Sequence, residues 1–590
     1  TVPYIFHKAI TSSEMEGAIT YETSRVNFIG RNRDLRNPSA MDNDSALLNT
    51  VGIVLDPIMS MRVRLRLEPG DVKEVYYITG TTNDKEEALA LAEEYGEVSK
   101  LEKVFNSYNK AIQLELKALG IKSSQANVYQ SLASYILFLH SGRRDREEYI
   151  KNISKHQQDL WAYGISGDLP IAMAVVKGEE DMDLVRGMIK MHYYWKIKGL
   201  KVDLLIYNDE EASYEQPMQK SIISAINLSK EGDILNKPGG IFLHNKSTMG
   251  EDIKDFIIGI SALYVDSEKG SIITQIKEVD TSEEVEFLRH KELVEKSKIN
   301  VQINKEEKVD YGEKILRNIE ELPENRDSRN DDLSKKLDFW NGYGGFDPED
   351  KSYVIRLNDY NNTPAPWINV VSNEDFGFHI SEVGSGYTWC GNSRENKITP
   401  WSNDWVIDPP GEALYIRDNN SGVYFSITPK PVRDGGEYII KHSFGYSTFT
   451  HTAYNIKGEM QIFCPKGEKL KIQKITLENL LDKEREVSIY YYAQLVLGVF
   501  NYGSAKYIST ELEENYICGQ NPYSQYFGNM RAYLTILGGE TLSFTGDRKE
   551  FLGVGEDMSS PNALNYKNLS NKTGSIYDPC LATETRSEEH

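Results

Sequence analysis

The sequence has little positive charge, and this shortage limits the partners that it can bind. Its 67 lysine and arginine residues stand against 89 aspartate and glutamate residues, which gives a formal net charge of −22 over 590 residues. A surface of that sign repels the phosphates of nucleic acids and the headgroups of anionic lipids. We therefore expect neither nucleic acid nor direct membrane contact for this chain.

Long apolar runs, a targeting signal and cysteine clusters are also missing. The run DFIIGISALYV, residues 255–265, is well short of the roughly 18 apolar residues that a membrane span needs. The first residues, TVPYIFHKAITSSEMEG, have no basic region followed by an apolar stretch, so no signal peptide is predicted. Four cysteines are too few for a disulfide framework and too widely spaced for a metal knuckle: Cys390, Cys464, Cys518 and Cys580. Cysteines this sparse fit a reducing cytoplasm, so we expect a cytoplasmic protein. The histidines show neither HxH nor HExxH spacing, so we expect no bound metal, and no other cofactor is predicted.

Aromatic residues are abundant, and the chain is long enough for several domains. The sequence contains 36 tyrosines, 19 phenylalanines and 7 tryptophans, an aromatic share of 11%. Such a composition is typical of strand-rich proteins and of proteins that bind sugar faces, and packing between strands is the simpler explanation. At about 150 residues each, three or four domains are expected.

Two segments, one near each end of the chain, have similar sequences and form an internal repeat. Residues 27–58, NFIGRNRDLRNPSAMDNDSALLNTVGIVLDPI, match residues 550–580, EFLGVGEDMSSPNALNYKNLSNKTGSIYDPC. Four positions match at one constant offset, and an Asp-Pro pair matches after a one-residue deletion: Phe28, Gly30, Pro38, Ala40 and Asp56-Pro57 with Phe551, Gly553, Pro561, Ala563 and Asp578-Pro579. The first copy is followed by MRVRLRLEPGDVKEVYYITG, which predicts two strands around a Pro-Gly turn. We expect the chain to enter midway through one copy and to leave before the other is complete.

Between the copies the hydrophobic pattern changes several times. Helical spacing comes first, followed by three apolar strands that alternate with helices, as in a small parallel α/β unit. Short aromatic strands separated by Gly, Asn and Pro turns then predict a β-sandwich. The five predicted segments are a partial β-sandwich repeat (1–83), a helical linker (84–160), the α/β unit (161–267), a charged linker (268–338) and a large antiparallel β-sandwich (339–590). The predicted fold is therefore multidomain α+β.

The segment GYTWCGNSRENKITPWSND, residues 386–404, has the mixture of side chains that a sugar-binding loop uses. Tryptophan rings fit the apolar faces of sugars, while amide and charged groups bind hydroxyls. The candidate substrate-binding residues are Trp389, Asn392, Arg394, Glu395, Asn396, Trp401, Asn403 and Asp404. The alternative is a long connection held by its own polar network, with Arg394 paired to Glu395 or Asp404.

Other acidic and glycine-rich segments favour structural roles. Asp168 in YGISGDLPI is a lone carboxylate before an apolar strand, and we interpret it as a turn residue rather than a general acid. The acids at 179–183 are expected at a solvated helix start. GYGGF, residues 342–346, lacks the Lys-Ser/Thr of a phosphate loop and predicts a tight turn.

Several long motifs resemble the family 94 glycoside phosphorylases. The sandwich motifs are WNGYGGFDPEDKSYVIRL, TPAPWINVVSNEDFGFHISEVGSGYTW, NSRENKITPWSNDWVIDPPGEALYIRD and HSFGYSTFTHTAYNIKGEMQIF. ETSRVNFIGRNRDLRNPSAM, LWAYGISGDLPIAM and YYWKIKGLKVDLLIYND are most similar to the 1,2-β-oligoglucan phosphorylases and to the phosphorylase-like part of cyclic β-1,2-glucan synthases.

The resemblance implies an inverting phosphorolysis. Inorganic phosphate, the co-substrate, attacks a terminal glucosyl unit of a β-1,2-gluco-oligosaccharide while a carboxylic acid protonates the leaving oxygen, and α-glucose 1-phosphate results. In the family these groups lie mainly on an (α/α)₆ barrel that follows the sandwich. We expect that catalytic barrel downstream of this chain, as its partner, and no catalytic residue within the chain.

We therefore predict a non-catalytic scaffold portion of a β-1,2-glucan phosphorylase, an enzyme of the glycoside phosphorylase class. The alternatives are the matching portion of a cyclic β-1,2-glucan synthase, a stand-alone carbohydrate-binding protein, and a hydrolase that needs no phosphate.

Overall fold

A computed structural model describes residues 3–210, 216–229, 232–275, 335–358, 361–513, 516–555 and 557–586. The chain forms two compact units, and both contain helices and sheets, in agreement with the predicted α+β class. The first unit consists of residues 1–123, 362–366 and 402–409, and the second of residues 124–361, 367–401 and 410–590. Most of the predicted charged linker lies outside the described residues, and the division into five segments stays a prediction.

The first unit contains two separate strand pairs. β1 (Tyr4–Thr11) pairs antiparallel with β4 (Val75–Thr82), and β2 (Thr20–Ser24) pairs with β3 (Pro57–Arg62). The predicted hairpin around the Pro-Gly turn is therefore wrong, because its two strands belong to different pairs. Twelve residues separate β3 from β4, and β4 instead forms eight matched positions with β1. The alternating pattern located β4, but only Met61 and Arg62 of MRVRLRL lie in a strand, and the pattern did not identify the partners.

Four helical elements complete this unit, and capping sets their ends. They are α1 (Arg25–Ile29), the 3₁₀ turn η1 (Ser39–Met41), α2 (Lys85–Glu94) and α3 (Val98–Leu119). Asp84 begins α2 because its carboxylate accepts the amides of Glu86 and Glu87 at 2.7 and 3.0 Å. Gly120, at φ 63°, ends α3 in the left-handed conformation that glycine adopts at low cost.

A parallel sheet forms the centre of the α/β part of the second unit. Its strand order is β7-β6-β5-β8, and every neighbouring pair is parallel. The strands are β5 (Ile171–Val176), β6 (Asp203–Asn208), β7 (Ile241–Asn245) and β8 (Leu263–Asp266). β5 and β6 are buried on both faces, which explains their continuous apolar sequence. The fourth strand, β8, was missed because its four residues end an apolar run that is mostly helical.

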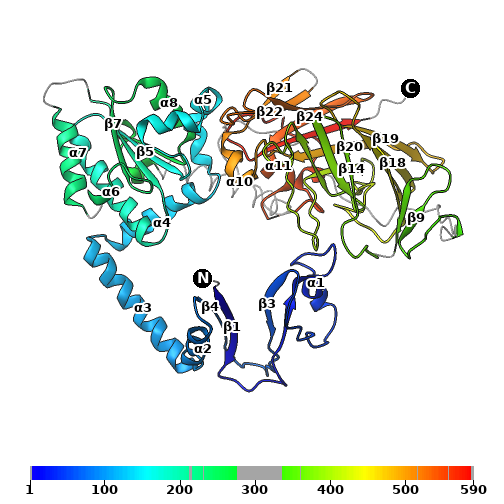
Figure 1. Ribbon diagram of the computed structural model, residues 1–590, viewed down its shortest axis with the longest axis horizontal. Coiled ribbons are helices and arrows are strands. Elements are labelled where there is room, and N and C mark those ends of the chain that lie inside the picture. The colour runs from blue at the N-terminus through cyan, green and yellow to red at the C-terminus, as the bar shows by residue number, and fades with distance from the viewer. Residues whose placement is uncertain are drawn as a thin grey trace, which may run out of the picture. The chain divides into compact units, whose positions relative to one another are not determined.

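Helices cover both sides of this sheet. In Figure 1, α6 and α7 lie on one side of the sheet, and α5 and α8 lie on the other. Met173, Leu205 and Phe242 of the sheet pack with Phe256 and Ile257 of α8 in one core. The helices are α4 (Ser123–Leu137), α5 (Glu147–Lys151), α6 (Met182–Ile197), α7 (Pro217–Leu228) and α8 (Glu251–Ile260). The 3₁₀ turns are η2 (Ser141–Arg146), η3 (Gln157–Tyr163), η4 (Glu179–Asp181), η5 (Gly232–Ile234) and η6 (Ser267–Lys269). Among the helices in the described ranges, none is long and apolar enough to cross a membrane.

The β-sandwich part is built from four antiparallel sheets. Their orders are β19-β18-β17-β16-β10-β9, β11-β12-β13, β15-β14-β20-β25-β24 and β21-β22-β23. The first two sheets contain β9 (Gly344–Phe346), β10 (Tyr353–Leu357), β11 (Ile368–Ser372), β12 (Phe376–Ser381), β13 (Gly386–Cys390), β16 (Tyr438–Ser443), β17 (Tyr446–Ala453), β18 (Ile456–Phe463) and β19 (Ile472–Asn479). The other two contain β14 (Glu412–Asp418), β15 (Tyr424–Phe425), β20 (Val487–Gln494), β21 (Ser509–Glu513), β22 (Tyr516–Gln520), β23 (Arg531–Thr535), β24 (Glu540–Asp547) and β25 (Pro579–Arg586).

Three cores hold the described residues of this part together. Phe378, Leu414, Ile440, Phe449 and Met460 belong to the core that joins the six-stranded sheet to β12 and β14. The second core packs two short helices against the five-stranded sheet, and the third joins that sheet to β22. The short helical elements are α10 (Asn501–Ser504), η8 (Ala505–Tyr507), α11 (Arg548–Leu552) and η9 (Asn562–Asn565).

The two copies of the sequence repeat share their local structure. In each copy a strand leads into a five-residue helix and a Pro-started 3₁₀ turn, and a second strand, begun by proline, pairs antiparallel with the first. Arg25 and Asp56 form an ion pair at 3.0 Å, and Arg548 and Asp578 form the same pair at 3.0 Å. The repeat in the sequence is therefore a repeat of structure.

Equivalent asparagine residues in the two copies support the same conclusion. In the first copy, Asn49 exchanges two hydrogen bonds with the backbone of Tyr21, both at 2.8 Å. In the second copy, Asn571 makes the same two bonds to Phe544, also at 2.8 Å. Both asparagines have positive φ, at 54° and 59°, which asparagine tolerates better than most residues.

Arg25 and Arg548 occupy equivalent positions, so the same substitution can be compared in the two copies. Arg25 also binds Asp404 through two hydrogen bonds, at 2.8 and 2.6 Å, whereas Arg548 forms its ion pair with Asp578 at 3.0 Å. Arg25→Ala should cost about 1.5–3 kcal/mol in local stability, because it leaves two carboxylates without their donor. Arg548→Ala should cost at most about 1 kcal/mol.

Hydrogen exchange over residues 402–409 measures the first effect. The Asp404 carboxylate accepts the amides of Val406 and Ile407 there, at 3.1 and 3.0 Å, and Arg25 holds that carboxylate in place. Equal exchange in the two variants would contradict the prediction.

Candidate functional site

The predicted sugar-binding segment begins on β13, whose two faces differ in character. Tyr387 lies opposite His379 of β12, and Trp389 lies opposite Gly377, so these side chains share one face of the sheet. Thr388, between them, points to the opposite face, where the polar core cluster described below is found. β13 therefore connects a partly exposed aromatic surface with a buried polar one.

Four rings form what we call the aromatic shelf: His379, Tyr387, Trp389 and Trp401. The rings of Tyr387 and Trp401 are stacked, with centroids 5.2 Å apart and planes inclined by 7°. His379 meets both rings edge-on, at 4.7 and 5.4 Å, and burial lowers its pKa to about 4, so it is neutral at neutral pH. Trp401 is 46% exposed and offers a ring to solvent from a fixed position. A ring held in this way suits the apolar face of a sugar.

The loop after β13 is held by its own polar groups. The Asn392 side-chain oxygen accepts the amides of Arg394 and Glu395, both at 2.9 Å. Asn396 is buried and donates to the carbonyl of Cys390 at 2.9 Å. The Lys397 ammonium donates to the carbonyls of Arg394 and Val499, at 3.1 and 3.0 Å. These bonds order the loop without a ligand, as the structural alternative requires.

Two charged side chains of this loop face solvent. Arg394 and Glu395 form an ion pair at 3.4 Å, with side chains 82% and 50% exposed. An exposed pair of this kind contributes little stability, so both groups can turn to hydroxyls of a ligand at low cost. With Trp401, they are the predicted residues best placed for contact with a sugar.

Asn403 and Asp404 lie in a different compact unit from the other six candidates. They belong to the first compact unit, and Asn403 has a positive φ of 51°. Burial alone would raise the pKa of Asp404, but hydrogen bonds from Arg25 and from backbone amides lower it. The Asp404 carboxylate thus has structural partners, and the distant Arg25 could not be recognised as one of them from the local sequence.

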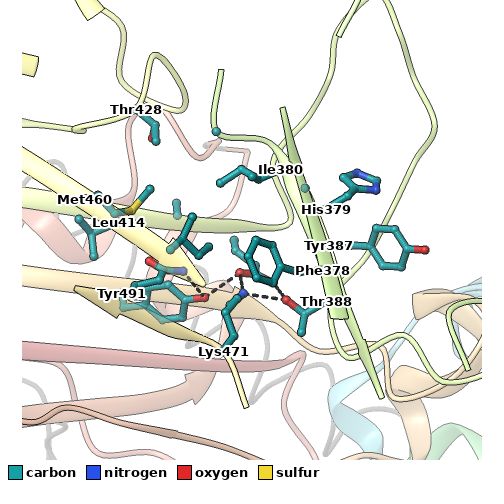
Figure 2. Close-up of a pocket in the computed structure, with 16 residues that line it drawn as sticks. Phe378, His379, Ile380, Tyr387, Thr388, Leu414, Thr428, Met460, Lys471 and Tyr491 are labelled. Atoms are coloured by element: carbon teal, nitrogen blue, oxygen red, sulfur yellow. Dashed lines mark hydrogen bonds and ion pairs between the residues drawn. The ribbon is translucent and has the colours of Figure 1, made fainter. Parts of the chain in front are cut away.

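A buried polar cluster on the other face of β13 was not predicted. The Glu412 carboxylate accepts hydrogen bonds from Thr388, Thr399 and Tyr491, at 2.6, 2.7 and 2.7 Å, and forms an ion pair with Lys471. Figure 2 shows the side chains of Thr388, Lys471 and Tyr491 converging between the strands. Burial favours the neutral acid, but Lys471 and the hydroxyl groups outweigh it and lower the pKa of Glu412 to about 2. The carboxylate is therefore ionised and unsuited to act as a general acid.

The cavity beside this cluster is too small for a sugar. Its volume is about 30 Å³, and its lining includes Phe378, Leu414, Met460, Lys471 and Tyr491. Such a space holds about one or two water molecules. No local signal marks the cluster in the sequence, because Thr388, Glu412 and Lys471 lie on separate strands or loops.

One group of possible metal ligands lies elsewhere on the sandwich. Ligand atoms of Glu511, Glu513 and Cys518 lie within 4.8 Å of one another. Arg531 makes ion pairs with both glutamates, at 3.4 and 3.5 Å. An arginine that already neutralises the carboxylates explains this cluster without a metal.

Comparisons with known proteins identify relatives of this chain. Residues 1–98 and 351–588 match the supersandwich domain of glycosyl hydrolase 94. Over 589 residues, 98% of this chain, it is 29% identical to a cyclic β-(1,2)-glucan synthase of Rhizobium meliloti, of which the match covers 20%. It is 28% identical to an N,N'-diacetylchitobiose phosphorylase of Vibrio proteolyticus and 23% identical to a solabiose phosphorylase of Paenibacillus borealis. These two matches cover 40% of this chain and 30% and 31% of those enzymes. The chain thus spans between about a fifth and a third of the length of these relatives.

Proposed function

Because this chain belongs to the glycosyl hydrolase 94 family, whose supersandwich domain it contains, we propose that it is the scaffold portion of an enzyme acting on β-1,2-glucans. The observation that carries the proposal is the match to a cyclic β-(1,2)-glucan synthase along 98% of the chain. The reaction would be the inverting phosphorolysis of β-1,2-gluco-oligosaccharides to α-glucose 1-phosphate, with inorganic phosphate as co-substrate. The catalytic acid would lie on an (α/α)₆ barrel outside these residues.

Three carboxylates among the described residues support a non-catalytic role. An inverting phosphorylase needs an acid with a raised pKa beside a space that admits a glucosyl unit. Glu412 lies beside a cavity but has a lowered pKa. Burial raises the pKa of Asp547 to about 7, but its carboxylate accepts the amide of Lys549 at 3.0 Å and begins α11. Asp168 accepts a hydrogen bond from Gln157 at 2.9 Å, as a turn residue would.

A second candidate context is the corresponding part of a cyclic β-1,2-glucan synthase. The two phosphorylase relatives match 40% of the chain, whereas the synthase match extends over the α/β part as well. This difference supports the synthase context as the second candidate. Both contexts share the scaffold role and the β-1,2-glucan.

Glucose 1-phosphate release tests the function. The chain is incubated with short β-1,2-gluco-oligosaccharides in phosphate buffer, alone and with a polypeptide that carries the family's catalytic barrel. We expect release only in the mixture. Release by the chain alone would contradict the scaffold role, and Asp547→Asn and Asp168→Asn would then identify the acid. Saturable oligosaccharide binding without release in the mixture would favour a carbohydrate-binding protein, and release of glucose without phosphate would favour a hydrolase.

The aromatic shelf provides a separate prediction about sugar binding. Trp401→Ala should weaken the binding of β-1,2-gluco-oligosaccharides about 3- to 10-fold, because it removes one stacking ring worth about 0.5–1.5 kcal/mol. Titration calorimetry measures the change. Trp161, which is 58% exposed on η3, supplies the matched control Trp161→Ala, and no change is expected there. Equal affinities for the wild type and Trp401→Ala would mean that the shelf is structural.

A further inference from the structure

Three basic side chains gather inside the second unit. They are Arg143 and Arg146 of η2 and Lys506 of η8, and Arg143 interacts electrostatically with both of the others. Arg143 and Arg146 are 4% and 2% exposed, and Lys506 is part-buried. Like charges repel, and burial removes the water that would weaken the repulsion. Such a cluster is stable only where acceptors or an anion balance its charge.

The cluster lies where the α/β part of the unit contacts the β-sandwich part. Tyr507, next to Lys506 in η8, belongs to the same core as Ile150 of α5. The Ser575 hydroxyl donates to the backbone carbonyl of Glu147 at 3.4 Å. A group that neutralises the cluster would therefore also stabilise the contact between these two parts.

Arg146 has acceptors of its own. Its Nη1 donates to the backbone carbonyls of Ile258 and Ser261, at 2.9 and 2.6 Å, at the end of α8. The last carbonyls of a helix lack partners within the helix, and the helix dipole is negative at this end, so a cation is favoured there. The charge that is left to balance belongs to Arg143 and Lys506.

Arg143 is buried without a partner for its charge. Its Nη1 is enclosed and makes no hydrogen bond, and among the described residues no carboxylate forms an ion pair with Arg143 or Lys506. Burial and the charge of Arg146 lower the pKa of Arg143 to about 9. Burial and the charge of Arg143 lower the pKa of Lys506 to about 8. A buried cation in this state destabilises the fold, and an anion beside it would remove that penalty.

Tyrosine side chains complete the surroundings. The Lys506 ammonium lies over the ring of Tyr507, 4.9 Å from its centroid, and Tyr507 stacks on Tyr523 with centroids 4.0 Å apart. Tyr507 also interacts electrostatically with Arg143. A ring face attracts a cation, but it does not neutralise the charge as an anion does, and a phenol hydroxyl can donate to an anion. Guanidinium, ammonium and phenol groups thus come together here, as in a receptor for an oxyanion.

We propose that Arg143 and Lys506 bind a tetrahedral oxyanion, inorganic phosphate, at the contact between the α/β and β-sandwich parts. The guanidinium group presents its N–H donors in a fork that fits two phosphate oxygens, and the ammonium group adds a second positive charge. Bound phosphate would hold η2 and η8 together. The choice of phosphate among oxyanions rests on the proposed function, in which phosphate is the co-substrate.

Phosphate binding by the whole chain tests the proposal. The chain is dialysed against inorganic phosphate at pH 7, with chloride keeping the ionic strength constant, and bound phosphate is measured. Arg143→Met and Lys506→Met, which remove a charge but keep a long side chain, should each weaken binding at least about 10-fold, because charge-assisted hydrogen bonds are lost. Arg186→Met is the matched control, because the Arg186 side chain is 60% exposed in the same unit, and it should leave binding unchanged.

Thermal unfolding shows whether the variants fold and whether the charge of Arg143 is unpaired. In chloride alone, Arg143→Met should unfold at the same temperature as the wild type or at a higher one, since an unpaired buried charge has been removed. Phosphate should raise the unfolding temperature of the wild type and of Arg186→Met, because it binds the folded state, and should not change that of Arg143→Met. Hydrogen exchange in η2 and η8 of the wild type should slow when phosphate is added.

Two results would overturn the proposal. One is phosphate binding that is absent from the wild type or equally strong in Arg143→Met. The other is a clearly lower unfolding temperature of Arg143→Met than of the wild type in chloride, which would mean that an acidic group of the chain itself already neutralises Arg143. Neither result bears on glucose 1-phosphate release, so a failure of this site is distinguishable from a failure of the proposed function.

Discussion

Glu412→Ala is expected to lower the free energy of unfolding of the β-sandwich by about 3–5 kcal/mol, because it leaves the Lys471 ammonium without its partner. The side chains of Glu412 and Lys471 are 13% and 12% exposed, so water can replace the lost carboxylate only in part. Three hydroxyl groups also lose their acceptor. Urea unfolding followed by hydrogen exchange of β14 measures the change.

Two further variants separate the ion pair from its surroundings. Replacing both Glu412 and Lys471 with apolar residues of similar size should cost much less than Glu412→Ala, because no charge is then left unpaired. Arg394→Ala removes an exposed ion pair and should change stability by at most about 0.5 kcal/mol. A double variant as unstable as Glu412→Ala would mean that the hydroxyl groups, and not Lys471, dominate.

The same carboxylate sets a pH dependence. The pKa of Glu412 is lowered from 4.5 to about 2 in the folded chain, so the unfolded state takes up its proton first as the pH falls. The stabilisation is complete above about pH 4.5 and is lost between pH 4.5 and pH 2. Glu412→Gln should remove this contribution to the acid sensitivity. An unchanged pH profile in Glu412→Gln would contradict the assignment.

Phe551→Ala is expected to cost about 3–5 kcal/mol, the second large effect. Phe551 is fully buried and stacks on Tyr492, with ring centroids 4.8 Å apart. Removing the ring leaves a cavity between α11 and the five-stranded sheet, where rigid strands allow little collapse. Hydrogen exchange of β24 and β25 during urea unfolding reports this loss.

Its counterpart in the first copy provides the contrast. Phe28 is only part-buried, so Phe28→Ala should cost about 1 kcal/mol or less in the chain alone. Equal costs for the two variants in the chain alone would contradict the difference in packing.

Most of the strands and helices, and the family resemblance, could be predicted from the sequence. Buried runs such as IAMAVV predicted the parallel strands, since apolar residues on both faces mark a strand covered on both sides. The ordered series of matches, from Phe28 with Phe551 to the two Asp-Pro pairs, revealed the repeat, because equal local geometry requires the same glycine, proline and capping positions. The long motifs identified the glycosyl hydrolase 94 supersandwich that the family match confirms.

Which distant groups meet is visible only in the folded chain. Periodicity states which face of a strand is apolar but not which strand lies beside it, so the partners of β3 and β4 were assigned wrongly. Glu412 meets Lys471, and Asp404 meets Arg25, across 59 and 379 residues of sequence. Charge pairing depends on distance in space, and a local motif carries no information about it.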